Sequence, residues 1–349
     1  SALIQKPKIE TGDLPLLDIL FQNKILKFCL KYGLVLDYDF ENLLTKIRNF
    51  YLNYDQKINI NINTLIFLSS LAQYNFFNNY IFAETDDELK KLEHLEKKLT
   101  KKFDDKTALE PYDYLRIACY RRLFNYKFSE SIHINDINEE LINYTVINPK
   151  KEITLIKNIK TVNVIKNNIS LKIRDQYETF PYPSWVYCKP QSNKRSISQY
   201  LKDLNIHISE GNEKSSEKQI VLIAGCGTGK QAVEFALALK NVEIVAIDLS
   251  KRSLGYAMRK CQEYNINNIK FFHCDILDVH KLNIQFDCIV CTGVLHHMKD
   301  PEKGLKELYH CLKKDGLIFL ALYSKIARSK LKIFQDLGQK IKDINDEKI

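Results

Sequence analysis

The chain has 349 residues, which is long enough for two domains, and 45% of them are hydrophobic, as expected of a globular protein with a sizeable core. The formal net charge is +9, with 52 basic residues mixed among 43 acidic ones. This mixture is typical of solvated surfaces and argues against a basic arm that would bind nucleic acid.

The chain has nine cysteines and no apolar segment long enough to cross a membrane, and both features indicate where in the cell the protein is found. Several cysteines lie within apolar runs, which predicts reduced core thiols in a cytoplasmic protein. Cys288 and Cys291 have C-x-x-C spacing, but residues three apart on a strand face opposite sides of a sheet, so no metal site is predicted. No signal peptide is visible, and no membrane insertion is expected.

The first half of the chain is predicted to be mainly helical. Apolar residues recur at helical spacing over residues 16–126. Residues 64–83 are apolar and aromatic, which indicates a buried helix or helix pair, and residues 86–102 are charged, as in a solvated helix. Residues 128–170 contain few signals for the start or end of a helix and are predicted to connect the helical part to the second half of the chain. We therefore expect a helical N-terminal domain over residues 1–165, which would hold a substrate or form a homodimer.

The second half, residues 166–349, is predicted to be an α/β domain with a parallel sheet, because strand-like runs alternate with helical segments. The expected strands are residues 220–224, 242–247, 269–273, 286–291 and 316–322, and the clearest helices are 230–239, 252–264 and 301–312. Ligands of such sheets bind at the carboxyl ends of the strands. A polar linker is expected at residues 210–218, and a helix at residues 328–341.

A glycine-rich turn follows the first of these strands. The G-x-G-x-G spacing differs from the G-x-G-x-x-G of dinucleotide binders, so we expect the loop to cradle an amino-acid moiety rather than a pyrophosphate. Its predicted ligand-binding residues are Gly225, Cys226, Gly227, Thr228 and Gly229, with Gln231 on the helix that follows.

An acidic residue ends the second strand. Asp248 can accept hydrogen bonds from both hydroxyls of a ribose, and Leu249 and Ser250 follow it. The alternative for Asp248 is a helix N-cap, but Ser250 is the better candidate for that position.

Two further loops follow strands three and four. Asp275 and Ile276 are predicted to contact an adenine ring, with a plain Asp-containing turn as the alternative. Thr292 and Gly293 open a loop that ends in His296 and His297. These histidines are candidate general bases, although a structural histidine at a strand end is the commoner case.

These motifs together resemble those of class I S-adenosylmethionine (SAM)-dependent methyltransferases, in order and in spacing, over residues 220–324. The resemblance implies a Rossmann-like sheet, SAM as cofactor and S-adenosylhomocysteine as product. It also implies a further antiparallel strand pair after the fifth strand. The residues after Ser324 show no pattern typical of strands, so we expect those strands to be missing from this chain.

A narrower resemblance concerns the run from Arg174 to Trp185, which is similar to the Q-Y-E-x-x-P-Y-P-x-W stretch of a bacterial methyltransferase subfamily with a helical N-terminal region. Residues 72–83 and 320–328 also resemble it. The subfamily includes rickettsial lysine methyltransferases of outer-membrane protein, which implies a protein-lysine acceptor. Tyr177, Tyr182 and Trp185 would then wall the methyl site and hold the amine and its methylated cation by cation–π attraction.

Three hypotheses about the function remain open. The first is a protein-lysine methyltransferase, the second is a small-molecule methyltransferase with a closed pocket, and the third is a SAM-binding scaffold without activity. For the three aromatic residues, plain core packing is the alternative to a lid over the cofactor.

Overall fold

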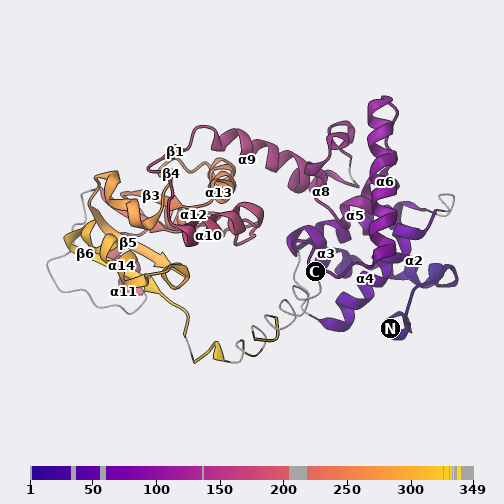
Figure 1. Cartoon of the computed structure of the whole chain (residues 1–349), viewed down its shortest axis with the longest axis horizontal. Helices are drawn as coiled ribbons and strands as arrows, with labels where there is room; N and C mark the ends of the chain where they lie inside the picture. The colour runs from indigo at the N-terminus through magenta and orange to yellow at the C-terminus, as the bar shows by residue number, and fades with distance from the viewer. Residues whose placement is uncertain are drawn as a thin grey trace. The chain divides into compact units, whose positions relative to one another are not determined.

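The computed structural model describes residues 2–32, 37–55, 60–135, 137–203 and 218–324, and beyond these residues 326–329, 331, 333 and 336–338. The chain divides into two compact units, residues 1–151 and 152–349 (Figure 1). This division lies 14 residues before the predicted boundary at 165/166, because the end of one helix and a short strand belong to the second unit. The predicted linker, except Lys218, and half of the residues of the predicted helix at 328–341 lie outside the described residues.

The first unit is built from helices around one hydrophobic core. The residues that face this core recur at helical spacing, such as Leu43, Leu44 and Ile47. The segment predicted as a buried helix or helix pair is one helix, α5, with most of its residues buried. The helices are α1 (Ala2–Gln5), α2 (Leu14–Gln22), α3 (Lys24–Tyr32), α4 (Tyr38–Asn53), α5 (Ile62–Phe77), α6 (Asp86–Asp104), α7 (Pro111–Ala118), α8 (Glu139–Ile142) and α9 (Asn148–Ile156), the last of which crosses the boundary.

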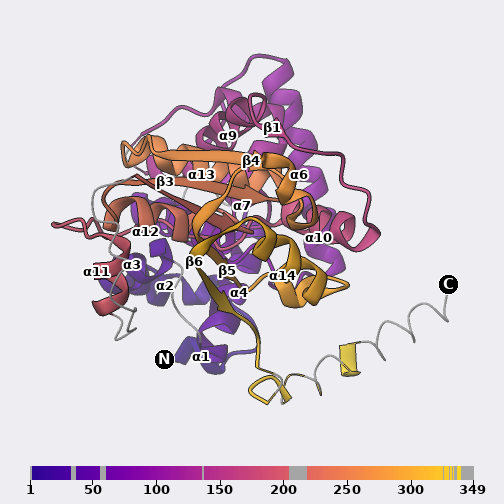
Figure 2. The ribbon, with the colours of Figure 1, turned by 90° about the vertical axis from the view of Figure 1, so that its left-hand side faces the viewer.

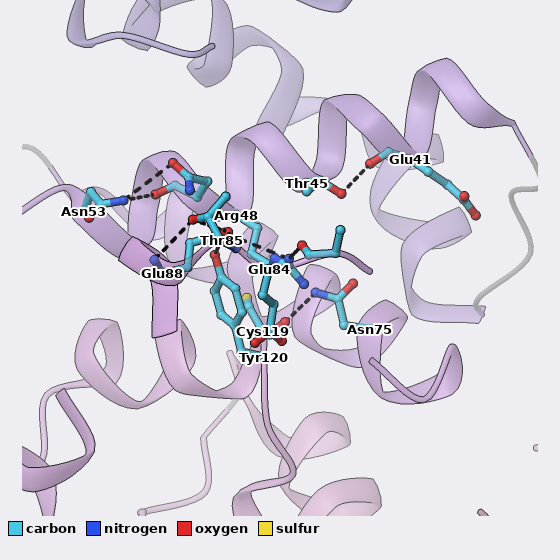
Figure 3. Close-up of polar contacts among 12 residues, drawn as sticks. Glu41, Thr45, Arg48, Asn53, Asn75, Glu84, Thr85, Glu88, Cys119 and Tyr120 are labelled. Carbon is cyan, nitrogen blue, oxygen red and sulfur yellow. Dashed lines mark hydrogen bonds and ion pairs between the residues drawn. The ribbon is translucent and has the colours of Figure 1, made fainter. Parts of the chain in front are cut away.

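A buried polar network joins α4, α6 and the end of α7 (Figure 3). Thr85 and Glu88 form a capping box that begins α6. Tyr120 donates to Glu88 Oε1 at 2.5 Å, and its ring lies 4.0 Å from the guanidinium carbon of Arg48. Arg48 Nη2 lies 3.9 Å from the same carboxylate oxygen and donates to the carbonyl of Ala83 at 2.7 Å. The buried charges of Arg48 and Glu88 therefore offset each other within the helical core.

The second unit contains a six-stranded parallel sheet with the order β1-β4-β3-β2-β5-β6, which Figure 2 shows from the side of this unit. The five predicted strands are confirmed, with ends that differ by a few residues. A sixth, β1, was not predicted and pairs with β4. The strands are β1 (Lys160–Thr161), β2 (Gln219–Ala224), β3 (Val242–Asp248), β4 (Ile269–His273), β5 (Phe286–Thr292) and β6 (Leu312–Ala321).

Side chains of the central strands alternate between two cores, one on each face of the sheet. On one face, strand residues such as Val221 and Cys288 pack with α12 (Lys230–Ala238) and α13 (Lys251–Glu263). On the other face, Leu222 and Cys291 pack with η6 (Ile276–Leu282) and α14 (Pro301–His310). Cys288 and Cys291 thus face opposite sides, as the strand spacing predicted, and both are free thiols.

Strand β6 lies at one edge of the sheet and is followed, within the described residues, by no further strand. Apolar side chains remain partly exposed along and just after it, among them Leu317, Phe319 and Leu322. Among the described helices, none is both long and apolar enough to cross a membrane.

Candidate functional site

A cavity of about 520 Å³ lies at the carboxyl ends of β2, β3, β4 and β5, where parallel sheets bind their ligands. This volume is within the range of small-molecule and cofactor sites. Every lining residue belongs to the second unit. The lining residues are Ser170, Ile173, Tyr177, Tyr182, Pro183, Gly225, Cys226, Gly227, Lys230, Gln231, Glu234, Asp248, Leu249, Cys274, Asp275, Ile276, Thr292, Gly293, Val294, His297, Met298 and Tyr323.

The glycine loop after β2 follows a path that side chains would block. Gly225, Gly227 and Gly229 have φ angles of +73°, +53° and +79°, in the left-handed region that favours glycine. A Cβ on Gly227 would lie 2.4 Å from the backbone oxygen of Tyr182, and one on Gly229 would lie 2.4 Å from the Cβ of Ala257. The loop therefore packs closely against two other segments while Gly225, Cys226 and Gly227 face the cavity.

Asp248 ends β3 and lines the cavity. Its Oδ2 accepts from the backbone N–H of Gly227 at 2.8 Å, and its Oδ1 accepts from that of Ser250 at 2.8 Å. Burial raises the pKa of Asp248 to about 6, and the negative charge of Glu178 acts in the same direction. The carboxylate thus joins the glycine loop to the next helix, and each oxygen keeps a lone pair for a ligand hydroxyl.

Ser250 caps α13 rather than lining the cavity. Its side chain accepts from Ser253 N, as the sequence favoured, and its hydroxyl donates to the carbonyl of Tyr177 at 3.1 Å. Thr228 and Gly229 also lie outside the lining. These three predicted ligand-binding residues are therefore not part of the cavity lining, and their contacts hold the glycine loop and the start of α13 in position.

The loops after β4 and β5 supply the predicted residues to the other walls. Asp275 and Ile276 line the cavity, and the Asp275 carboxylate also accepts from Leu277 N at 3.0 Å. Asp275 therefore both stabilises the turn after β4 and lines the cavity. Thr292 and Gly293 line the cavity, and Thr292 Oγ1 donates to Gln231 Oε1 at 2.9 Å.

Helix α10 (Asn168–Thr179) and the Pro-Tyr-Pro segment after it close one side of the cavity. Tyr177 and Tyr182 line it, as expected. The carbonyl of Tyr182 accepts from Thr228 N at 3.2 Å, and the carbonyl of Pro183 accepts from the Thr228 hydroxyl. The segment is thus bonded to the glycine loop itself. Tyr182 and Pro183 therefore line the cavity beside the glycine loop.

The expected place of Trp185 in the cavity wall is wrong. Trp185 is buried in a small core with Cys188, Val233 and Cys261. Its Nε1–H donates to the carbonyl of Thr228 at 3.2 Å, and the ammonium of Lys260 lies 5.0 Å from its ring. Core packing, the alternative noted for this side chain, is what the structure shows. The indole stabilises the glycine loop through its hydrogen bond to Thr228.

We therefore expect Trp185→Ala to lower stability and SAM affinity together. Removing a buried indole costs about 3–5 kcal/mol, and the Thr228 carbonyl loses its partner. Urea unfolding followed by circular dichroism, with calorimetric titration of SAM, measures both. Tyr187→Ala, which removes an aromatic ring that is 66% exposed, is the control. Reduced turnover at unchanged stability and affinity would restore Trp185 to the methyl site.

The two histidines occupy different positions. His297 lines the cavity, whereas His296 lies behind it, stacked on Tyr323 with ring centroids 3.6 Å apart. Their Nε2 atoms are 3.1 Å apart. Burial and the nearby charge of Arg328 hold the pKa of both rings below the usual 6.5. His297 is thus a neutral imidazole at the cavity at pH 7, and the expectation that His296 faces the reacting atoms is corrected.

Several lining residues were not predicted. Ser170 and Ile173 come from α10, Lys230 and Glu234 from α12, and Tyr323 from the segment after β6. Lys230 directly follows the glycine loop, and Tyr323 lies in the stretch that resembles the bacterial subfamily, so both carried a usable signal. Ser170 and Ile173 precede the Arg174–Trp185 run on α10, and their place in the wall depends on tertiary packing, so they had no such signal.

The residues present fit SAM. The glycine cradle, the carboxylate at the end of β3 and the cavity volume match a nucleoside that carries an amino-acid moiety. Among the described residues, no group of three or more His, Cys, Asp or Glu side chains is arranged to hold a metal ion.

Comparison with known proteins agrees with this fit. The model of a family described as a methyltransferase domain matches residues 221–316. An uncharacterized protein of Synechococcus is 37% identical over 117 residues, which are 33% of this chain and 28% of that protein. The tRNA U34 carboxymethyltransferase of Campylobacter fetus is 38% identical over 103 residues, 29% of this chain and 36% of that enzyme.

Rickettsial proteins are also similar. An uncharacterized protein of Rickettsia prowazekii is 27% identical over 140 residues, 39% of this chain and 24% of that protein. The solved structure of PKMT2 from Rickettsia typhi in complex with AdoHcy has 30% identity, a TM-score of 0.28, and coverage of 30% of this chain and 20% of that chain. This chain thus spans well under half the length of these curated relatives. Its second unit contains a class I methyltransferase domain whose cofactor is SAM.

Proposed function

We propose that this chain methylates lysine side chains of a protein substrate, an outer-membrane protein by the subfamily resemblance. The observation that carries the proposal is the aromatic wall of the cavity, which reaches solvent. Tyr177, Tyr182 and Tyr323 line the cavity, and Tyr182 is 65% and Tyr323 45% exposed. A side chain presented by a folded protein can reach such a wall, whereas a small-molecule enzyme needs no open side.

The wall also suits a cation. The guanidinium carbon of Arg328 lies 3.2 Å from the centroid of the Tyr323 ring, and His296 stacks on the same ring at 3.6 Å. Both faces of Tyr323 are therefore occupied, and the rings of Tyr177 and Tyr182 are the ones left for a methylated ammonium. Burial raises the pKa of Tyr177, which keeps its phenol neutral. A methylated ammonium would therefore meet neutral aromatic rings at this end of the cavity.

The chemistry requires a neutral amine. Bound SAM supplies a methyl carbon activated by a positive sulfonium. A lysine ammonium has a pKa of about 10.4 in water, and the nearby positive charge lowers it. After the proton leaves, the amine lone pair forms the N–C bond as the C–S bond breaks, and that electron pair stays on sulfur. We infer that His297 accepts this proton, because it lines the cavity and its lowered pKa leaves the imidazole neutral at pH 7.

In-line geometry accounts for most of the expected rate. The chain holds the acceptor side through Tyr182 and Tyr177, and the cofactor side through the glycine loop to which Tyr182 is bonded. The helical unit, residues 1–151, would provide further surface for a protein substrate or for a homodimer. No part of the proposal uses nucleic acid, a metal ion or membrane insertion.

We expect Tyr182→Ala to lower turnover roughly tenfold, about 1.4 kcal/mol, while SAM affinity changes little, because the backbone bond to Thr228 remains. Tyr182→Phe, which keeps the aromatic face, should retain most of the turnover. The assay transfers labelled methyl groups from SAM to a size-separated lysate, and peptide mass spectrometry locates them. Tyr187→Ala is the control for removal of an exposed aromatic ring.

Three results would contradict the proposal. Label that appears only in low-mass metabolites would indicate the small-molecule alternative, and methyl groups on residues other than lysine would exclude the acceptor. SAM binding without transfer to any fraction would indicate the scaffold alternative.

A further inference from the structure

Glu178 lies at a junction between three parts of the cofactor site. It is the residue after Tyr177 on α10, and its Oε1 accepts from the backbone N–H of Lys251 at 2.6 Å. Lys251 is the first residue of α13, where unpaired N–H groups and the helix dipole favour a negative group. The adjacent Ser250 hydroxyl donates to the carbonyl of Tyr177. Two neighbouring bonds therefore tie the end of α10 to the start of α13.

The same junction reaches Asp248. Ser250 N–H donates to Asp248 Oδ1, so the N-terminus of α13 is held by Asp248 from the sheet and by Glu178 from α10. Two carboxylates thus converge on consecutive residues of one short segment. Glu178 is the acidic residue of the Q-Y-E stretch, but the sequence assigned it no role, and it is not among the residues that line the cavity.

We propose that Glu178 is a positioning residue for the cofactor, which holds α10 against the start of α13 and acts through its charge on Asp248. The proposal concerns only the cofactor side of the cavity and is independent of the acceptor. It rests on the geometry of the junction, and the pKa of Asp248, raised to about 6 partly by Glu178, agrees with it.

A pH profile tests the charge effect. Since the Asp248 carboxylate must be ionised to accept two hydroxyl hydrogen bonds, SAM affinity should fall as the pH drops below about 6. Glu178→Gln removes the neighbouring negative charge but keeps an acceptor for Lys251 N–H. Because loss of a like charge lowers the pKa of Asp248, the midpoint should move to lower pH.

Other titratable groups surround Asp248 and must be separated from it. His273 is its strand partner on β4, and burial lowers the pKa of this imidazole. His273→Asn should leave the midpoint in place if Asp248 is the titrating group. The remaining charged or titratable groups that face this region are Tyr177 from α10, Lys230 and Glu234 from α12, Lys251 from α13, and Asp275 after β4.

Removing the side chain tests the positioning effect. Glu178→Ala should weaken SAM binding at pH 7.5 roughly threefold to tenfold, because α10 loses its charged hydrogen bond to α13. Asp175→Asn, one turn earlier on the same helix and paired only with Arg174 among the described residues, is the matched control. Glu178→Gln should bind SAM nearly as the natural protein does at this pH.

The probe is SAM itself, titrated by calorimetry from pH 5 to pH 8 in the full chain. A Glu178→Gln profile that superimposes on that of the natural protein, or a midpoint that disappears in His273→Asn, would overturn the charge effect. An unchanged affinity in Glu178→Ala would overturn the positioning role. If the alanine variant does not fold, the glutamine variant still decides the proposal, since it keeps the shape and the acceptor.

Discussion

Asp248→Ala is expected to lower SAM affinity at least roughly tenfold. Two hydrogen bonds from hydroxyl groups to a carboxylate are lost, each worth about 1.5–3 kcal/mol, and tenfold requires only about 1.4 kcal/mol. The structure adds a second cause. Gly227 N–H and Ser250 N–H both lose their acceptor, so the glycine loop loses one of its bonds to β3 and keeps those from Gly225 N and Cys226 N to the carbonyl of Ile247.

Asp248→Asn separates these causes. The amide keeps the size of the side chain, but its NH₂ group must face one of the two backbone N–H donors, so one bond becomes a donor–donor contact. We expect a loss of affinity close to that of the alanine variant, with a fold that survives in circular dichroism. Asp315→Ala, at an exposed position before the parallel run of β6, is the control. An unchanged SAM affinity in both Asp248 variants would exclude Asp248 as the ribose ligand.

Gly227→Ala is expected to have the other large effect. The residue has φ of +53°, which costs an L-residue about 1–2 kcal/mol, and its Cβ would lie 2.4 Å from the backbone oxygen of Tyr182. Backbone cannot move aside as a side chain can, so either the glycine loop or the Pro-Tyr-Pro segment must shift. Both SAM binding and the unfolding midpoint should therefore fall.

Gly293→Ala isolates the conformational cost. Its φ is +74°, but no atom lies within 4 Å of the position that a Cβ would take. The difference in unfolding free energy between the two variants, measured in urea, thus reports the collision with Tyr182 alone. Equal stabilities would show that the close approach of the two segments is not needed for the fold.

The class of fold and most of the cofactor side of the site could be predicted from the sequence because their signals are local. Short continuous apolar runs mark strands that are buried on both faces, positive φ angles favour glycine, and Asp248 at the end of its strand puts a carboxylate at the edge where parallel sheets bind ligands. The opposite orientation of Cys288 and Cys291 follows from the two-residue period of a strand and needs no tertiary information.

The tertiary structure decided which of the flanking residues face the cavity. Trp185 and Tyr182 lie three residues apart in one motif, yet the indole enters the core and the phenol lies at the cavity. Strand β1 has two residues and pairs with β4 more than a hundred residues later, so no local pattern could mark it. Glu178 acquires its role only where α10 meets α13. In each case the deciding contact joins segments far apart in the chain, and the burial that selects one side chain over its neighbour exists only once those segments have packed.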